Sequence, residues 1–282
     1  MADSTDSRPI GMLDSGVGGL SVLREVRQLL PSESVIYVGD QGHLPYGPRP
    51  REEIRSFVSG IIQFLLDQNC KLIVIPCNAA CAAALHYART AFPAIPIVGM
   101  EPAIKPAAEH TKTGVIGVIT TKATYQGELF ASVLDRFANG IQVETQVCPE
   151  LVLLVEQGAP DTPQSQAIVA GYLDPLKATG IDELVLGCTH FPFLDKQIRA
   201  QLGSDIEIID PAPAVARQLG RVLAQRQLAH PAGAVGQVRY LTTGDADHMR
   251  FLIKTLLHEA EPAVEAVQWH NDRSIEVVRN PV

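Results

Sequence analysis

Two cysteines of this sequence directly follow short apolar runs, at positions where a buried strand would end. Cys77 follows residues 72–76, and Cys188 follows residues 183–187. If a helix begins at such a position, its free amides and its dipole favour the thiolate over the thiol, whose pKa in free cysteine is about 8.5. A thiol and a thiolate together form an acid and a base. The plainer alternative is that both are small buried hydrophobic residues, as free cysteines commonly are.

Three ionisable side chains have positions that suit partners of these thiols. Asp14 ends another apolar run, His190 lies two residues after Cys188, and Glu156 lies in an apolar stripe at 151–157. A carboxylate in such a stripe requires a partner or exposure, and a cysteine with a histidine–glutamate partner makes a tunable acid–base group. The alternatives are a capping or core histidine and a solvated glutamate.

A glycine-rich turn follows the first apolar run, with the sequence Asp14-Ser15-Gly16-Val17-Gly18-Gly19-Leu20. Glycines at a helix start let backbone amides approach an anion, so the turn predicts a cradle for a carboxylate or a phosphate. It is not a dinucleotide fingerprint, because the third glycine of that pattern would fall at Ser21. A structural tight turn is the alternative.

A second loop has the sequence Pro45-Tyr46-Gly47-Pro48 and lies between an apolar run and the next amphipathic stretch. A phenol and free amides on a proline-stiffened loop suit the binding of a ligand carboxylate. The alternative is an ordinary turn with a packed tyrosine.

The remaining cysteines, Cys70, Cys81 and Cys148, have no such partners, and we interpret them as structural. Cys81 follows Cys77 by one helical turn, but no further ligands come at zinc-like spacing, so no metal site is expected. Five cysteines scattered through a long chain predict reduced thiols rather than disulfides.

The elements that would position these residues alternate between short β-branched runs and amphipathic stretches. The runs at 9–14, 34–39, 71–76, 95–99, 114–119, 141–147, 183–186 and 205–209 predict strands. Helix starts are indicated at Pro50, at Thr162-Pro163 and at Pro211. This alternation predicts an α/β fold with mostly parallel sheets.

A weak internal repeat divides the pattern into two similar halves. Asp14 and Cys77 are 63 positions apart (77 − 14), and Thr121 and Cys188 are 67 apart (188 − 121), so one loop accounts for the difference. Ligands of open parallel sheets bind beyond the carboxyl ends of the strands. Two facing halves would therefore bring these four residues to one cleft.

Composition excludes several other classes of protein. The 282 residues include 46% hydrophobic side chains, enough for two modest domains, and the net charge is −8 without a basic block, which argues against nucleic-acid binding. No run reaches the roughly 18 apolar residues of a membrane span, and residues 1–6 carry no signal-peptide pattern. We expect a cytoplasmic protein that binds no membrane.

The four motifs together resemble those of the glutamate racemase family, in the aspartate/glutamate racemase superfamily. The motifs are Asp14–Leu20, the Pro-Tyr-Gly of the second loop, Cys77-Asn78 and Gly187-Cys188-Thr189-His190, in the family's order. The resemblance covers residues 10 to about 257. It implies racemisation of glutamate without pyridoxal phosphate, other cofactor or metal, and use of the product in peptidoglycan synthesis.

The resemblance also implies roles for individual residues. Cys77 and Cys188 would exchange the α-proton of the substrate, with Cys77 serving the D-enantiomer. The assisting residues would be Asp14, His190 and Glu156, and the substrate-binding residues Asp14, Ser15, Tyr46, Gly47, Asn78, Ala79, Thr189 and His190.

One residue departs from the family pattern, which reads Cys-Asn-Thr-Ala where this chain has Cys77-Asn78-Ala79-Ala80. The missing hydroxyl removes one hydrogen bond to a charged substrate group, which costs about 1.5–3 kcal/mol unless water or an amide compensates. Two alternatives therefore stay open: a racemase of aspartate or another amino acid, and a ligand-binding or regulatory protein of low activity on the same fold.

For the whole chain we predict two flavodoxin-like, pseudo-symmetric α/β domains with the active site between them. Residues 1–100 and 210–270 would form the first, discontinuous domain, and residues 101–209 the second. Residues 271–282 show no clear periodicity and predict a flexible tail or an interaction segment. The resemblance further implies a homodimer.

Overall fold

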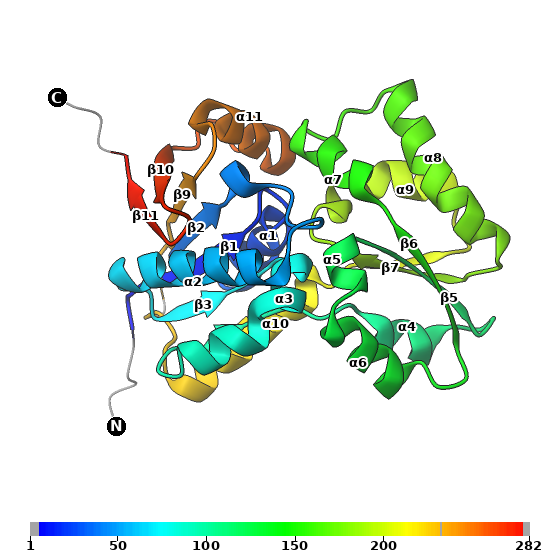
Figure 1. Ribbon diagram of the computed structural model, residues 1–282, viewed down its shortest axis with the longest axis horizontal. Coiled ribbons are helices and arrows are strands. Elements are labelled where there is room, and N and C mark those ends of the chain that lie inside the picture. Colours follow the sequence, from blue (N-terminus) through cyan, green and yellow to red (C-terminus); the bar gives the residue numbers. More distant parts are fainter. Residues whose placement is uncertain (1–5, 232, 279–282) are drawn as a thin grey trace.

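The computed structural model describes residues 6–231 and 233–278, which form two β-sheets surrounded by helices (Figure 1). The larger sheet consists of β1 (Ile10–Asp14), β2 (Val35–Gly39), β3 (Leu72–Val74), β4 (Ile97–Val98), β9 (Val238–Thr242), β10 (Val264–His270) and β11 (Ser274–Val277). The smaller sheet consists of β5 (Val115–Thr120), β6 (Gln142–Val147), β7 (Glu183–Gly187) and β8 (Glu207–Ile209).

Helices alternate with these strands along the chain. They are α1 (Leu20–Leu29), α2 (Arg51–Asp67), α3 (Asn78–Ala91), α4 (Ile104–His110), α5 (Lys122–Tyr125), α6 (Glu128–Phe137), α7 (Pro149–Glu156), α8 (Pro163–Ala178), α9 (Asp195–Leu202), α10 (Ala212–Arg226) and α11 (Ala246–Leu257). Two short 3₁₀ helices, η1 (Gln41–His43) and η2 (Phe191–Leu194), follow β2 and β7. We call the larger sheet with its helices the first lobe, and the smaller sheet with α4 to α9 the second lobe.

Both lobes repeat one strand order, which confirms the internal repeat and the predicted α/β class. The first four strands of the chain are ordered β2-β1-β3-β4, and those of the second lobe β6-β5-β7-β8. All pairings among them are parallel. The carboxyl ends of β3 and β7, where the two cysteines follow, occupy equivalent places in the two sheets.

All eight predicted strands are present, whereas the strands after α10 were missed. β10 and β11 each contain a single buried residue, and β9 begins with two half-buried ones, so their apolar pattern is weak. The predicted tail at 271–282 is wrong for its described part: 271–273 form a turn, and β11 pairs antiparallel with β10. Residues 279–282 lie outside the described residues.

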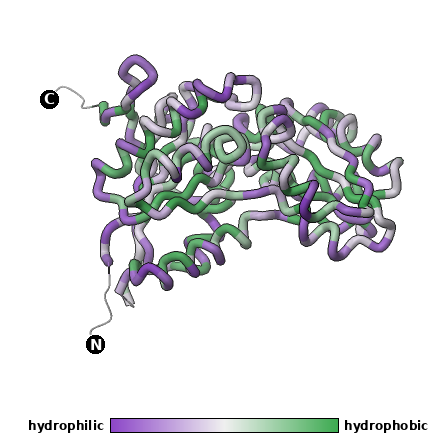
Figure 2. Tube along the Cα trace, turned by 60° about the horizontal axis from the view of Figure 1, so that its bottom comes forward, coloured by the Kyte–Doolittle hydropathy of each residue, from purple (hydrophilic) through white to green (hydrophobic). Residues whose placement is uncertain are grey.

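Burial explains why the central strands read as continuous apolar runs. Every residue of β1, β2 and β7 is buried, as expected for strands covered by helices on both faces. Helix α2 packs against α3, and α1 packs against α10. Figure 2 shows hydrophobic segments concentrated in the interior and hydrophilic ones in the outer loops.

The polypeptide passes from the first lobe to the second after β4 and returns after β8. We propose that the chain divides at residues 101 and 210 into two domains. None of the helices in the described ranges combines the length and the apolar character that crossing a membrane requires.

Candidate active site

Cys77 lies where the prediction placed it, between β3 and α3. It is the N-cap residue of α3, with an extended backbone, and its Sγ accepts a hydrogen bond from the Ala80 amide at 3.4 Å. The thiol faces Ser15 Oγ at 3.8 Å. The residue is buried, and the helix N-terminus and one hydroxyl form its polar surroundings.

Cys188 follows β7, but no helix begins at this residue. A turn comes first, and the next helical segment is η2, whose N-cap is His190. The prediction of a helix dipole at this thiol is therefore wrong. Its polar neighbour is instead the imidazole, with Sγ and His190 Nδ1 3.6 Å apart.

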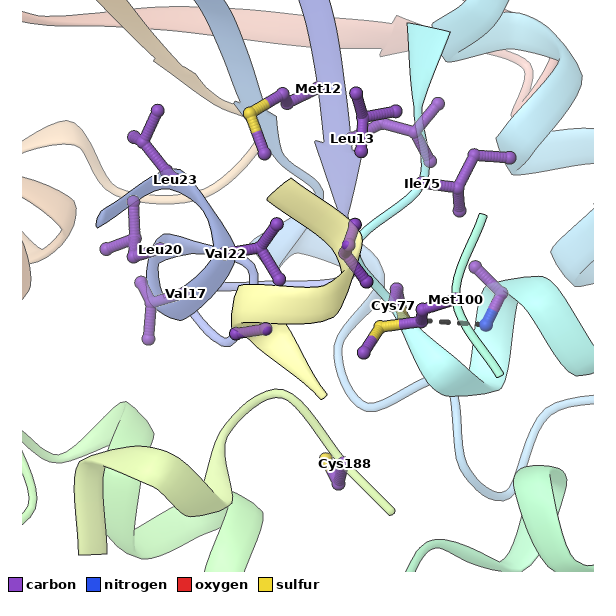
Figure 3. Close-up of a cluster of buried hydrophobic side chains, with 14 of the residues drawn as sticks. Met12, Leu13, Val17, Leu20, Val22, Leu23, Ile75, Cys77, Met100 and Cys188 are labelled. Atoms are coloured by element: carbon purple, nitrogen blue, oxygen red, sulfur yellow. Dashed lines mark hydrogen bonds between the residues drawn. The ribbon is translucent and has the colours of Figure 1, made fainter. Parts of the chain in front are cut away.

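Both cysteines line one cavity of about 320 Å³ at the boundary of the lobes. The first lobe contributes Ser15, Pro45, Tyr46, Gly47, Pro48, Cys77, Asn78 and Ala79, and the second Thr121, Lys122, Val147, Pro149, Val152, Leu153, Cys188, Thr189 and His190. In Figure 3, Cys77 lies at the start of one helix and Cys188 on a separate segment. The predicted juxtaposition of the two strand ends is thus observed, and Thr121 takes part in it.

His190 and Glu156 form a buried ion pair behind the cavity wall. His190 Nε2 lies 2.8 Å from Glu156 Oε1, with side-chain exposures of 3% and 8%. Burial by itself would lower the pKa of His190, but its bonds to Cys188 and Glu156 hold that pKa well above its usual value. Burial would likewise raise the pKa of Glu156, which His190 and two further donors keep below its usual range. Both contacts therefore favour the charged form of the imidazole beside Cys188.

The glycine-rich turn is a cradle for an anion, but the anion belongs to the protein. The Val17 amide donates to Glu156 Oε1 at 2.9 Å, and the Gly16 amide donates to Asp14 Oδ1 at 2.7 Å. A Cβ at position 16 would collide with Glu156 Oε1, and one at Gly18 with His190. The prediction that this turn holds a ligand carboxylate is therefore wrong, because Glu156 already occupies it.

Asp14 lies behind the cavity rather than in its wall, and it is fully buried. Burial raises the pKa of Asp14 to about 6, although His190 and the Gly16 amide act in the opposite direction. Its Oδ2 accepts a hydrogen bond from Thr189 Oγ1 at 3.2 Å. Asp14 thus contacts the loop of Cys188 directly, while it acts on Cys77 through its charge.

The Cys77 thiol titrates differently from our expectation. Burial, followed by the Asp14 carboxylate, raises the pKa of Cys77 well above its usual value, against the amide of Ala80. The helix N-terminus is present but does not dominate.

The Pro45–Pro48 loop is held by Asp40, which was not among the predicted site residues. The Tyr46 hydroxyl does not point to a ligand but donates to Asp40 Oδ2 at 2.6 Å. The fully buried Asp40 also accepts from Trp269 Nε1 at 2.7 Å and from Thr243 Oγ1 at 2.6 Å, and it contacts His43 Nδ1 at 3.0 Å. Asp40 follows a predicted strand, and this strand-end position was the available signal.

Asn78 presents a buried side-chain amide to the cavity. Its side chain is 3% exposed, and neither Nδ2 nor Oδ1 has a hydrogen-bond partner among the described residues. Buried amides are normally satisfied, so this one indicates a ligand contact. Ala79 lies next to it in the cavity wall.

The other three cysteines lie outside the cavity wall. All are buried, and burial raises the pKa of Cys70, Cys81 and Cys148 to about 12. Buried thiols of high pKa are inert, which agrees with their interpretation as structural residues.

The chain belongs to the Asp/Glu/Hydantoin racemase family, whose model matches residues 10–219. Within this family it is an isomerase of the glutamate racemase type. It is 48% identical to the glutamate racemase of Ectopseudomonas mendocina over 89% of this chain and 95% of the relative.

Solved structures agree with this assignment. Glutamate racemase isoform RacE1 from Bacillus anthracis superposes with a TM-score of 0.83 at 36% identity, covering 93% of this chain and 97% of that one. Glutamate racemase from Francisella tularensis, solved with D-glutamate, gives 0.81 at 29% identity, covering 93% and 98%.

Proposed function

We propose that this protein interconverts L- and D-glutamate by moving the α-proton between Cys77 and Cys188. The observation that carries the proposal is the placement of both thiols, one from each lobe, in the wall of the same cavity. The cavity is of the size expected for a small substrate, and the unpartnered Asn78 amide supplies a polar contact within it.

The chemistry divides into two proton transfers. A thiolate takes the α-proton, so a bond from Cα to hydrogen breaks and an S–H bond forms. The opposite thiol then donates its own proton to the other face of Cα, which inverts the centre and exchanges the protonation states of the two sulfurs. Because an α-proton is very weakly acidic, the site must place both sulfurs close to Cα and stabilise the developing charge.

The two sulfurs have unequal surroundings in this scheme. Charged His190, held by Glu156, is the counter-ion for a thiolate at Cys188. Cys77 has Ser15, the Ala80 amide and the charge of Asp14. On the family resemblance we assign Cys77 to D-glutamate and Cys188 to L-glutamate, with Ser15, Gly47, Asn78 and Thr189 as substrate contacts. Cytoplasmic location, a homodimer and a role in peptidoglycan synthesis rest on the same resemblance.

The test follows the circular dichroism of L-glutamate with the wild type, Cys77→Ser and Cys188→Ser. Loss of either acid–base group should reduce racemisation about 10²–10⁴-fold. Cys70→Ala, which removes a buried thiol outside the cavity, serves as the control. Full racemisation by either serine variant would contradict the two-thiol mechanism.

A comparison of substrates completes the test. Turnover of aspartate in preference to glutamate would favour an aspartate racemase. Binding of glutamate by the wild type, without incorporation of solvent deuterium at Cα, would instead favour a ligand-binding protein.

A further inference from the structure

Gln41 joins three parts of the chain through one side-chain amide. It is the first residue of η1, directly after Asp40. Its Nε2 donates to Glu156 Oε2 at 2.9 Å, and its Oε1 accepts from Thr242 Oγ1 at 2.9 Å. The Thr242 hydroxyl also accepts from the Gly244 amide at 3.0 Å. Because both ends of the amide are engaged, its donor is directed at Glu156.

Glu156 is the residue through which this contact reaches the reacting sulfur. Its Oε1 accepts from the Val17 amide and contacts His190 Nε2, while its Oε2 receives the Gln41 amide. His190 Nδ1 in turn lies 3.6 Å from Cys188 Sγ. A continuous series of hydrogen bonds therefore leads from β9 of the first lobe to the cysteine of the second.

We propose that Gln41 is a positioning residue for the Cys188 half of the reaction. It holds the Glu156 carboxylate in the orientation that keeps Oε1 on His190, so that the charged imidazole stays beside Cys188. Among the described residues Cys77 has no equivalent connection, since its polar contacts there are Ser15 Oγ and the Ala80 amide. This inference rests on the proposed two-thiol function and assigns Gln41 no contact with substrate.

The readout must separate the two halves of a reversible reaction. Because the enantiomers have equal free energy in water, kcat/KM is the same in both directions for every variant. The primary isotope effects measured with α-deuterated L-glutamate and with α-deuterated D-glutamate differ from each other. Each one reports how strongly proton abstraction by one of the two cysteines limits the rate. Impairment of Cys188 should raise the isotope effect for L-glutamate and lower it for D-glutamate.

The experiment compares Gln41→Met with Gln63→Met. Gln63 donates to Asp67 Oδ1 at the same 2.9 Å, but on the exposed face of α2. Loss of a hydrogen bond to a buried carboxylate should lower kcat/KM about tenfold in Gln41→Met, with the isotope effects shifted as described, and leave Gln63→Met unchanged. Thr242→Val, which releases Oε1 of Gln41, should shift the same isotope effects by a smaller amount.

Wild-type isotope effects in both Gln41→Met and Thr242→Val would overturn the inference, and so would an increase confined to D-glutamate. If Gln41→Met does not fold, Thr242→Val alone decides. A wild type that shows no thiol-dependent racemisation would instead contradict the proposed function. Retained thiol dependence together with wild-type isotope effects in both variants would contradict only the role of Gln41.

Discussion

At the scale of single residues, the site combines charged groups that are hidden from the cavity with polar groups that face it. Asp14 and Glu156 lie behind the wall and bond to backbone amides, Thr189 and His190. Asn78 faces the cavity with an unpartnered amide, beside Ala79. The departure at Ala79 therefore lies on the surface of the cavity and not in the charged network behind it.

Ala79→Thr should restore a hydroxyl to this surface and raise kcat/KM for glutamate. A hydrogen bond to a charged group contributes about 1.5–3 kcal/mol, which corresponds to roughly ten- to hundredfold. Ala91→Thr, on the exposed last residue of α3, controls for the effect of threonine in this helix. Initial rates of racemisation check the prediction, and unchanged or reduced kcat/KM in Ala79→Thr would mean that another group already fills this place.

At the scale of elements, the carboxyl-end loops of the first lobe depend on the carboxyl-terminal strands. The loop with Tyr46 is tied to β10 through Asp40, which accepts both the Tyr46 hydroxyl and the Trp269 indole. Trp269 also packs against Phe57 of α2, with ring centroids 5.7 Å apart. The hairpin of β10 and β11 thus supports a wall of the cavity from outside.

Trp269→Phe should destabilise the protein and loosen this loop. The substitution keeps an aromatic ring but removes one of the donors to a buried carboxylate, at a cost of about 1.5–3 kcal/mol. Urea denaturation followed by far-ultraviolet circular dichroism measures the loss, and hydrogen exchange at residues 44–47 should accelerate. KM for glutamate should rise with the mobility of the loop.

Tyr172→Phe provides the matched control, because Tyr172 donates to the Glu150 carboxylate on an exposed surface. It should change the free energy of unfolding by less than about 1 kcal/mol. Equal losses in the two aromatic variants would show that burial of Asp40 does not set the strength of the Trp269 contact.

At the scale of the whole molecule, polar contacts between the lobes cluster around the proposed catalytic cysteines. Glu156 of the second lobe bonds to Val17 and Gln41 of the first, and Thr189 bonds to Asp14. The Ser21 hydroxyl of α1 adds a bond to the carbonyl of Thr189 at 3.0 Å. The groups that tune the two cysteines are therefore also groups that hold the lobes together.

Glu156→Gln should lower stability in a way that depends on pH. Removing one member of a buried ion pair costs about 3–5 kcal/mol, of which the retained amide recovers a part. Because the pKa of His190 is raised in the folded protein, His190 contributes its full stabilisation below its unfolded pKa of 6.5. That contribution is lost as pH rises through the folded pKa. Because the pKa of Glu156 is lowered in the folded protein, Glu156 contributes its stabilisation above its unfolded pKa of 4.5. That contribution is lost as pH falls through the folded pKa.

The loss of unfolding free energy in Glu156→Gln, relative to the wild type, should therefore be larger at about pH 6 than at about pH 10. Urea denaturation at both values measures it. Glu265→Gln, which breaks a partly exposed pair with Arg239, should show a deficit below about 1 kcal/mol at either pH. A Glu156→Gln loss that is independent of pH would mean that Glu156 does not raise the pKa of His190.

The amino-acid sequence alone determined the α/β class, eight strands, the two matching halves and the cysteines that follow β3 and β7. These features are encoded locally, because a strand covered on both faces must be apolar and a polar residue at its end must leave the core. The helix start at Thr162-Pro163 was also predicted from the sequence, and in the structure Thr162 forms the capping box of α8.

Only the tertiary structure decided which polar and charged side chains contact one another. Asp40, Gln41 and Trp269 acquire their roles through contacts with residues far away in the chain, and no local pattern specifies such partners. The same holds for the glycine-rich turn. Its sequence predicts that it binds an anion, but only the packing of α7 against it shows that this anion is the Glu156 carboxylate. The pKa of Cys77 likewise depends on burial and on the Asp14 charge, which arise when the sheet and helices pack around it.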